Sequence, residues 1–324
     1  MVLLLGASGY IGHAFAGELR RRGHCFIPLT RRAMDYTRFE LLFDYVRRMK
    51  PRFIINAAGL TGSPKVDACE LAREEALAAN TLLPQTVARV CLMTHTLWGH
   101  VSSGCIYSGA KVLENGGKRI EKNLNQPEFR RLLAEHPENV FGFTEWDEPN
   151  FSFRCPPCNF YSGTKVLAEE AIHGLGCSYI WRPGIPFSER EELRNLLWRL
   201  QRCPKVHDAV HPLSQVDDFV RACLNLWEGE SPFGVYNVVN PGVVTTAQVV
   251  QMIQDILKPD HEIEFWKDDK EFYQHAARAP RSNCILETTK LQGAGVEMRP
   301  VEEALEDSLH NWQCVTPPLG MVLH

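Results

Sequence analysis

The N-terminal segment of the chain places a short apolar run directly before a cluster of glycines. Val2–Leu5 has the composition of a β-strand, and a helical pattern continues to Arg22 after the turn Gly6-Ala7-Ser8-Gly9-Tyr10-Ile11-Gly12. A strand, a glycine-rich turn and a helix form the opening of a dinucleotide-binding fold, in which a diphosphate approaches the helix N-terminus. The alternative is a plain strand-to-helix turn. The segment predicts an α/β protein with a doubly wound parallel sheet, and cofactor contacts from Gly6, Ser8, Gly9, Tyr10, Ile11 and Gly12.

The end of the second expected strand, Cys25–Leu29, indicates which dinucleotide is bound. An NAD site usually has an Asp or Glu there, whereas this chain has Arg31 and Arg32. Arginines suit a 2′-phosphate, so NADP(H) is preferred over NAD(H), with solvated surface arginines as the alternative. The remaining expected cofactor contacts are Asp35 and Tyr36 near the adenine, and the small residues Ala57, Ala58 and Gly59 after the third strand.

Two side chains suited to proton transfer lie four residues apart, at Tyr161 and Lys165. On a helix they share one face. A lysine beside a phenol favours the phenolate, which predicts a pKa of Tyr161 lowered towards neutrality and a general acid for a carbonyl being reduced. Chance produces the same spacing in many proteins. Ser103, at the carboxyl end of the expected strand 96–103, is placed to bond a substrate carbonyl.

Composition narrows the class of protein and its compartment. A formal net charge of −4 without a basic tract argues against a nucleic-acid partner. Eleven cysteines without a disulfide or metal framework favour reduced thiols and a cytoplasmic location. The chain has one CxxC motif, at Cys155-Pro156-Pro157-Cys158, and no second one, which argues against a zinc site. The two thiols of this motif are then either a redox dithiol or part of a simple turn. Neither a signal peptide nor a membrane span is expected, and no metal site is predicted.

The pattern of segments predicts two lobes. Residues 1–185 form an NADP-binding, Rossmann-like domain with a polar insertion at 111–145, in which a short helix is expected near 127–134. This insertion could cover the site, or it could be a structural or disordered insert. Residues 186–315 form a small substrate-binding lobe, with a strand near 235–239 returning to the main sheet, and 316–324 form a tail. A long helical region is expected over about 66–93, and a helical segment over about 189–202. Arg194, Asn195 and Arg281 are candidate ligands for a diphosphate, with plain surface polarity as the alternative.

The order of these motifs resembles that of the extended short-chain dehydrogenase/reductases. The matching positions are the Gly6–Gly12 turn, 56–59, Asn80, Ser103 and 161–165. Within that superfamily, the segment 66–70 is similar to one of the dTDP-4-dehydrorhamnose reductases. The chain resembles more closely the UDP-4-keto-6-deoxyglucose 3,5-epimerase/4-reductases of plant rhamnose synthesis, through the segments 57–62, 104–107, 142–145, 148–151, 240–243 and 279–283.

The resemblance implies a role for each matching residue. Ser103 would hold the C4 carbonyl, Tyr161 would protonate its oxygen, and Lys165 would depress the pKa of the tyrosine and bind the nicotinamide ribose. Asn80 would support the lysine through water. Cys105 occupies the position of a cysteine that exchanges a proton beside the carbonyl. The remaining candidates are Pro183 for the cofactor, and Thr61 and Gly104, together with Ser103, for the substrate.

The resemblance implies NADPH-dependent reduction of the C4 keto group of a nucleotide-linked 4-keto-6-deoxy sugar, in rhamnose biosynthesis. Relatives that also epimerise C3 and C5 carry a lysine where this chain has Arg199. A guanidinium is a poor proton donor, which puts epimerisation in doubt. The bifunctional epimerase/reductase is nevertheless kept as an alternative, as are an NAD-dependent epimerase or dehydratase and a non-catalytic regulator of the methionine adenosyltransferase type. Relatives often form dimers, so a homodimer is a candidate assembly.

Overall fold

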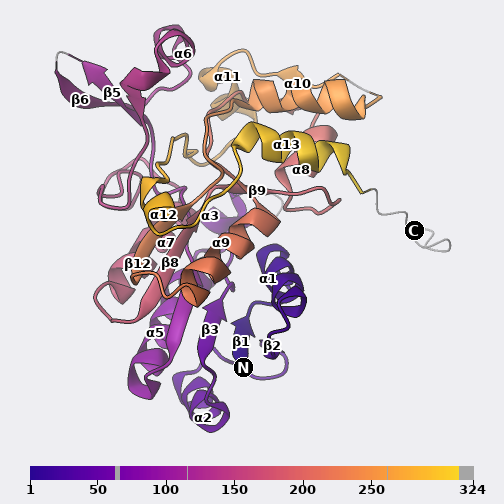
Figure 1. The fold of residues 1–324 in the computed structure, drawn as a ribbon. Coiled ribbons are helices and arrows are strands. Elements are labelled where there is room, and N and C mark those ends of the chain that lie inside the picture. The colour runs from indigo at the N-terminus through magenta and orange to yellow at the C-terminus, as the bar shows by residue number, and fades with distance from the viewer. Residues whose placement is uncertain (63–65, 115, 261, 314–324) are drawn as a thin grey trace.

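The core of the protein is a six-stranded parallel sheet in the order β12-β8-β4-β3-β1-β2 (Figure 1). A computed structural model describes residues 1–62, 66–114, 116–260 and 262–313; the predicted tail 316–324 lies outside them. The strands of the sheet are β1 (Val2–Leu5), β2 (Phe26–Leu29), β3 (Phe53–Asn56), β4 (Leu97–Val101), β8 (Ser178–Pro183) and β12 (Gly234–Val238). Every pair of neighbours in this sheet is parallel, which confirms the predicted doubly wound sheet.

Helices cover both faces of this sheet. They are α1 (Tyr10–Arg21), α2 (Phe39–Met49), α5 (Leu83–Thr94), α7 (Phe160–Ile172) and α9 (Val216–Glu228). Leu4 and Trp181 belong to the apolar cluster shared with α1 and α9. Leu3 and Ile180 belong to the cluster on the other face, with α2, α5 and the end of α7. Because side chains alternate along a strand, a run of consecutive apolar residues such as β1 is the pattern of a sheet buried on both faces.

The predicted long helical region over about 66–93 is confirmed, with one break. The short helix α3 (Ala68–Leu71) comes first, and α4 (Arg73–Leu77), a π-helical turn (Ala78–Leu82) and α5 then follow one another without interruption. The backbone leaves the helical region at Ala72, with φ −118° and ψ 53°. The π-helical turn carries Asn80, and single π turns inside helices occur frequently at functional sites.

The described part of the insertion is more regular than the polar, irregular segment that the sequence suggested, and the helix predicted near 127–134 is confirmed. It forms an antiparallel sheet of β5 (Ala110–Glu114), β6 (Gly117–Glu121) and β7 (Val140–Phe141), with α6 (Pro127–Glu135) and a 3₁₀ turn (Pro137–Asn139) between β6 and β7. Its helix α6 lies beside α11 (Asp269–His275) of the C-terminal lobe, whereas the β5–β6 hairpin points away from that lobe (Figure 1).

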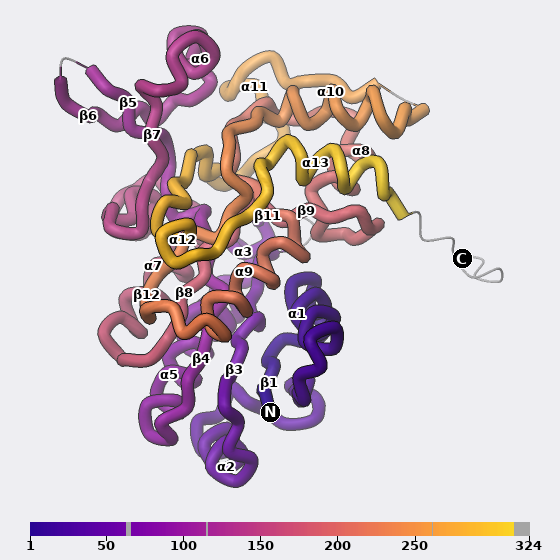
Figure 2. The backbone as a smooth tube through the Cα atoms, viewed as in Figure 1, coloured from indigo at the N-terminus to yellow at the C-terminus, as the bar shows by residue number. Residues whose placement is uncertain are grey.

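The C-terminal lobe packs above the carboxyl ends of the parallel strands, and its chain runs back to the sheet to form β12 (Figure 2). Its helices are α8 (Leu196–Arg202), α10 (Thr246–Leu257), α11, α12 (Thr289–Gly293) and α13 (Val301–His310). Two short parallel pairs complete it: β9 (Ile185–Phe187) with β11 (Leu213–Gln215), and β10 (Lys205–Val206) with β13 (Glu264–Phe265). The predicted helix 189–202 begins only at Leu196. None of the helices in the described ranges is long and apolar enough to span a bilayer.

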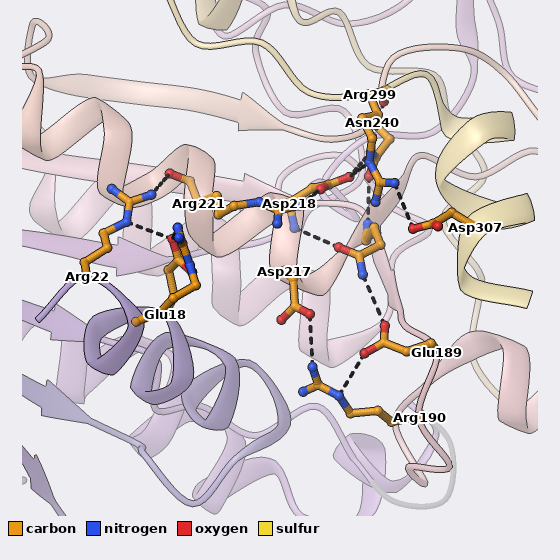
Figure 3. A network of polar contacts seen from close by, with 12 residues as sticks. Glu18, Arg22, Glu189, Arg190, Asp217, Asp218, Arg221, Asn240, Arg299 and Asp307 are labelled. Atoms are coloured by element: carbon orange, nitrogen blue, oxygen red, sulfur yellow. Dashed lines mark hydrogen bonds and ion pairs between the residues drawn. The ribbon is translucent and has the colours of Figure 1, made fainter. Parts of the chain in front are cut away.

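A network of charged side chains links α9 to its neighbours (Figure 3). Asp218 of α9 accepts hydrogen bonds from Arg299 Nε (3.0 Å) and Asn240 Nδ2 (3.1 Å). Arg299 also bonds Asp307 of α13 at 2.9 Å. On the other side, Arg22 at the end of α1 bonds Asn225 Oδ1 of α9 at 2.8 Å. These contacts attach the C-terminal lobe to the helix layer of the sheet domain.

Candidate active site

The glycine-rich turn between β1 and α1 is closely packed. Gly6 has a φ of +76°, and a Cβ atom there would lie 2.5 Å from the backbone nitrogen of Ala58. A Cβ atom on Gly12 would lie 2.0 Å from the carbonyl oxygen of Gly6. Gly9, the N-cap of α1, is exposed and offers no side-chain cap, so the amides of the first turn are available to a phosphate. The turn therefore has the form that a dinucleotide diphosphate requires.

The other predicted cofactor residues surround this turn. The Tyr10 hydroxyl donates to Ser188 Oγ at 2.7 Å, and Ile11 packs on the core. The residues that are exposed to solvent are Ser8, Arg31, Arg32, Asp35 and Gly59. Ala57 and Ala58 are partly exposed beside Gly6, whereas Pro183 is buried at the end of β8. Tyr36 is only 3% exposed, in the core beside Leu5, and burial raises its pKa. Tyr36 therefore forms part of the apolar core under the turn.

One face of α7 carries Tyr161, Lys165 and Glu169 at successive turns. Lys165 Nζ donates to the carbonyl of Val101 at 3.0 Å and lies 5.9 Å from the centre of the Tyr161 ring. Burial lowers the pKa of Lys165 to about 8. Burial also raises the pKa of Tyr161, although a hydrogen bond with Ser103 opposes this. The expectation of a tyrosine pKa lowered towards neutrality is therefore wrong here, because desolvation of the phenol dominates.

A raised pKa keeps the Tyr161 phenol protonated near neutral pH, which is the form that a proton donor needs. Ser103 follows β4 and is 4% exposed. Ser103 Oγ accepts from the Cys105 amide at 3.1 Å, and the Ser103 hydroxyl lies near enough to Tyr161 and to the Cys105 thiol to lower the pKa of both. The Ser282 hydroxyl donates to the Tyr107 carbonyl at 2.7 Å and also lowers the pKa of Cys105, but burial is the larger effect and raises it. Ser103, Cys105 and Tyr161 thus meet at the carboxyl end of β4.

Asn80 is fully buried and connects two segments of this centre through hydrogen bonds. Its Oδ1 accepts from the Leu60 amide at 2.8 Å, and its Nδ2 donates to the Leu60 carbonyl at 2.8 Å and to Thr164 Oγ1 at 3.2 Å. A Cβ atom on Gly59 would lie 3.2 Å from Asn80 Oδ1 and 3.5 Å from Lys165 Nζ. Asn80 therefore joins the loop after β3 to α7, and its proposed support of Lys165 stays a prediction.

Three arginines lie near one another in the neighbourhood of this centre. Arg194 is exposed, and its positive charge acts on Tyr161. Arg199 is partly buried; burial and the charges of Arg281 and Arg194 lower its pKa. Arg281 bonds Asp67 Oδ1 at 3.2 Å. Such a group of guanidinium ions suits an anionic ligand.

Asn195 is not placed for substrate binding. It is fully buried, and its Oδ1 accepts from the amides of Leu197 (3.0 Å) and Ser188 (3.2 Å). Its Nδ2 donates to the carbonyls of Ser188 and Arg190, both at 2.7 Å. The side-chain polar atoms of Asn195 are therefore all engaged: Oδ1 caps α8 through the Leu197 amide, and the other bonds hold the loop before the helix.

The other two predicted substrate residues lie at the edge of the centre. Thr61 is exposed after β3. Gly104 donates its amide to the Pro183 carbonyl at 2.8 Å, and a Cβ atom there would lie 2.5 Å from Leu286 Cδ1. Gly104 thus lets the Ser103 loop pack closely on β8.

Several residues of the site escaped the sequence interpretation. Asp67 accepts the amides of Arg278 (2.9 Å) and Ala279 (2.8 Å) and so fixes the loop that carries Arg281. Glu169 and Arg182 form a buried ion pair at 2.6 Å behind Lys165. The spacing of Glu169, four residues after Lys165, was a usable signal for its position, but its partner on β8 was not apparent from the sequence.

The two thiols of the Cys-Pro-Pro-Cys segment precede α7. Cys155 is exposed and Cys158 is partly buried. Asn159 follows as the N-cap of α7: its side chain accepts from the Ser162 amide at 2.8 Å and donates to the Pro280 carbonyl at 2.9 Å. Within the described part of the chain, no group of three or more His, Cys, Asp and Glu residues is arranged to hold a metal ion. The redox interpretation of the two thiols stays untested.

Comparison with protein families and curated proteins gives matches over nearly the whole chain. A family model described as RmlD substrate binding domain matches residues 1–314. A trifunctional UDP-glucose 4,6-dehydratase/UDP-4-keto-6-deoxy-D-glucose 3,5-epimerase/UDP-4-keto-L-rhamnose-reductase of Arabidopsis thaliana is 28% identical over 306 residues, which cover 94% of this chain and 41% of that protein. The chain thus spans about two fifths of that relative. A bifunctional dTDP-4-dehydrorhamnose 3,5-epimerase/dTDP-4-dehydrorhamnose reductase of the same plant is 27% identical over 307 residues, 94% of this chain and 90% of that protein.

Solved structures share the fold. A UDP-rhamnose synthase from Acanthamoeba polyphaga mimivirus superposes with a TM-score of 0.79 at 19% identity, covering 96% of this chain and 98% of the other. A dTDP-4-dehydrorhamnose reductase from Bacillus anthracis, solved in complex with NADP, gives a TM-score of 0.71 at 20% identity and 96% coverage of both chains. These similarities confirm the predicted Rossmann-like architecture.

Proposed function

Since the chain belongs to the RmlD substrate binding domain family, as its sequence predicted, we propose that it reduces the C4 keto group of a nucleotide-linked 4-keto-6-deoxy sugar with NADPH. The observation that carries the proposal is the meeting of Ser103 and Tyr161 at the carboxyl end of β4, with Lys165 on the same face of α7. The names of the relatives agree with the predicted class, an NAD(P)-dependent oxidoreductase acting on a nucleotide sugar.

The chain's own residues fit such a cofactor. The close packing of Gly6 and Gly12 and the uncapped start of α1 suit its diphosphate, and exposed Arg31 and Arg32 suit a 2′-phosphate. When bound, the nicotinamide would supply the hydride. The buried ammonium of Lys165 adds positive charge beside the ribose, as the family resemblance implies.

The proton comes from the protein. The Ser103 hydroxyl donates a hydrogen bond to the substrate carbonyl oxygen and stabilises the negative charge that develops there. The Tyr161 phenol gives its proton to that oxygen, leaving a phenolate that the Lys165 charge stabilises until solvent returns the proton. The product is the C4 alcohol. Arg194 and Arg281 attract the diphosphate of the substrate.

A second candidate, 3,5-epimerisation, is favoured by the contact of the Cys105 thiol with Ser103 beside Tyr161. Two features oppose it. Burial raises the pKa of Cys105, so little thiolate is available to abstract a proton. Arg199 takes the position of the lysine acid in bifunctional relatives, and a guanidinium seldom releases its proton. Reduction without epimerisation is therefore the better-supported function.

The decisive experiment is a panel of UDP- and dTDP-linked 4-keto-6-deoxy sugars with NADPH, followed by absorbance at the nicotinamide band and by NMR of the product. Consumption of NADPH with formation of a C4 alcohol supports the reductase. A protein that binds NADPH but oxidises it with no member of the panel is instead a non-catalytic binder. Solvent deuterium at C3 and C5 of the product, lost in Cys105→Ser, would establish the bifunctional alternative.

A further inference from the structure

A cavity of about 640 Å³ lies between the insertion and the C-terminal lobe. Its wall includes Lys122, Asn123 and Asn125 from the insertion, Tyr273 from α11, and the loop 278–283. Its size falls within the range of pockets that hold small ligands. The insertion therefore contributes one side of a pocket that the sheet domain and the lobe would leave open.

The cavity lies beside the catalytic centre, because its wall packs on the segments that carry Ser103 and Tyr161. Ser282 lines the cavity and its hydroxyl donates to the Tyr107 carbonyl at 2.7 Å, on the loop after Ser103. Pro280 also lines it, and its carbonyl accepts from Asn159 at 2.9 Å, at the start of the helix that carries Tyr161. Arg281, the neighbouring residue, also lines it. If a sugar is held at Ser103 and Tyr161, as the proposed function requires, the group attached to that sugar extends past Arg281 into this space.

The insertion is firmly attached on its side of the cavity. Leu124 and Phe129 are buried with Val210 and Ile285 of the remaining chain. Asn125 Nδ2 donates to Asp269 Oδ1 at 2.8 Å. A wall that is already held in place spares a ligand the cost of ordering it. The geometry fits a permanent wall better than the mobile cover that the sequence allowed.

Most of the charged side chains that line the cavity are positive: Lys122, Arg278 and Arg281, against Asp269. The ion pairs of the insertion engage Lys111, Arg119 and Arg130, and in the described part of the chain none engages Lys122. Arg278 also lines the cavity and is exposed. Asp269 is the one carboxylate among the described lining residues, and its Oδ1 is bonded to His207 and Asn125. Such a balance favours a ligand with phosphate groups.

We propose that the insertion is part of the substrate site, and that Lys122, together with Arg278, binds the diphosphate of the nucleotide-linked sugar. The proposal rests on the proposed function, because it takes the sugar to be held at Ser103 and Tyr161. It identifies a specificity element outside the motifs that define the sheet domain. The insertion then selects substrates that carry a nucleoside diphosphate over free 4-keto sugars.

The test is calorimetric titration of UDP and of dTDP into the full chain, with wild type, Lys122→Ala, Lys122→Arg and the control Arg131→Ala. Arg131 is an exposed cation on α6 of the same insertion and does not line this cavity. Of UDP and dTDP, the nucleotide that wild type binds more tightly should bind Lys122→Ala about tenfold more weakly, which is the loss expected for one charge-assisted hydrogen bond. Lys122→Arg should keep most of the affinity, and Arg131→Ala should keep all of it.

Affinity for NADPH serves as the internal control and should be the same in all four proteins. Equal nucleotide affinity in wild type and Lys122→Ala overturns the inference, as does a wild type that binds neither UDP nor dTDP. If Lys122→Ala fails to fold, Lys122→Gln takes its place under the same criteria. A Lys122-dependent nucleotide affinity in a protein that reduces no 4-keto sugar would support the cavity assignment and refute the proposed function, so the two can fail separately.

Discussion

Neutralising Glu169 tests how α7 is held against the sheet. Glu169 and Arg182 are 7% and 4% exposed. Arg182 Nη2 donates to Glu169 Oε2 at 2.6 Å, and Arg182 Nε lies 3.1 Å from both carboxylate oxygens. Ser102 at the end of β4 donates to the same carboxylate. Glu169 therefore connects α7 to two strands of the sheet, one turn beyond Lys165.

The substitution Glu169→Gln removes the negative charge and leaves the Arg182 guanidinium buried, with the Tyr107 hydroxyl, at 2.9 Å, as its remaining partner. A glutamine can accept only on its single oxygen and turns its NH₂ group towards other donors. Breaking a buried ion pair from one side costs about 3–5 kcal/mol. We expect a loss of this size in the free energy of unfolding.

The assay is urea unfolding followed by tryptophan fluorescence, because Trp98 and Trp181 are buried in the sheet. The matched control is Glu170→Gln on the same helix, whose ion pair with Arg154 is exposed and should be worth less than about 1 kcal/mol. The double variant Glu169→Gln/Arg182→Met should recover much of the loss, because neither position then carries a buried charge without its partner. If Glu169→Gln is no less stable than Glu170→Gln, the reasoning about this pair is wrong.

Three further predictions concern the chemistry. Tyr161→Phe should lower kcat by about 10²–10⁴-fold while NADPH affinity, measured by fluorescence, stays nearly constant; an unchanged kcat refutes Tyr161 as proton donor. Because burial lowers the pKa of Lys165 to about 8, the lysine is charged below that pH and neutral above it. The value of kcat/KM should therefore fall about tenfold for each pH unit above about 8. A kcat/KM that stays constant up to about pH 10 contradicts a role for the charged lysine. Arg31→Ala should weaken NADPH about tenfold and leave NADH unchanged, and an equal effect on both cofactors removes the 2′-phosphate assignment.

The local patterns of the sequence were sufficient for the sheet and the main motifs. The apolar run of β1 and the Gly6–Gly12 turn predicted the parallel sheet, because burial on both faces and close backbone packing leave few alternatives at those positions. Ser103 and Tyr161 were assigned from a strand end and a helical spacing, and in the structure the Ser103 hydroxyl lies near enough to Tyr161 to lower its pKa. Their catalytic roles stay predictions until turnover is measured.

Other features depend on contacts between segments far apart in the sequence. Asn195 was expected at the substrate, but buried carbonyls of Ser188 and Arg190 take its amide hydrogens. The insertion was expected to be irregular, but it packs its apolar residues on the lobe.

The protonation of the site depends on such contacts most of all. The sequence determined that Tyr161 and Lys165 share a helix face, because that follows from the geometry of an α-helix alone. Only the tertiary structure decided that burial raises the pKa of the tyrosine and lowers that of the lysine, since desolvation depends on everything packed around a group. It also decided that Lys122 of the insertion faces the same cavity as Arg281, a proximity that no local pattern encodes.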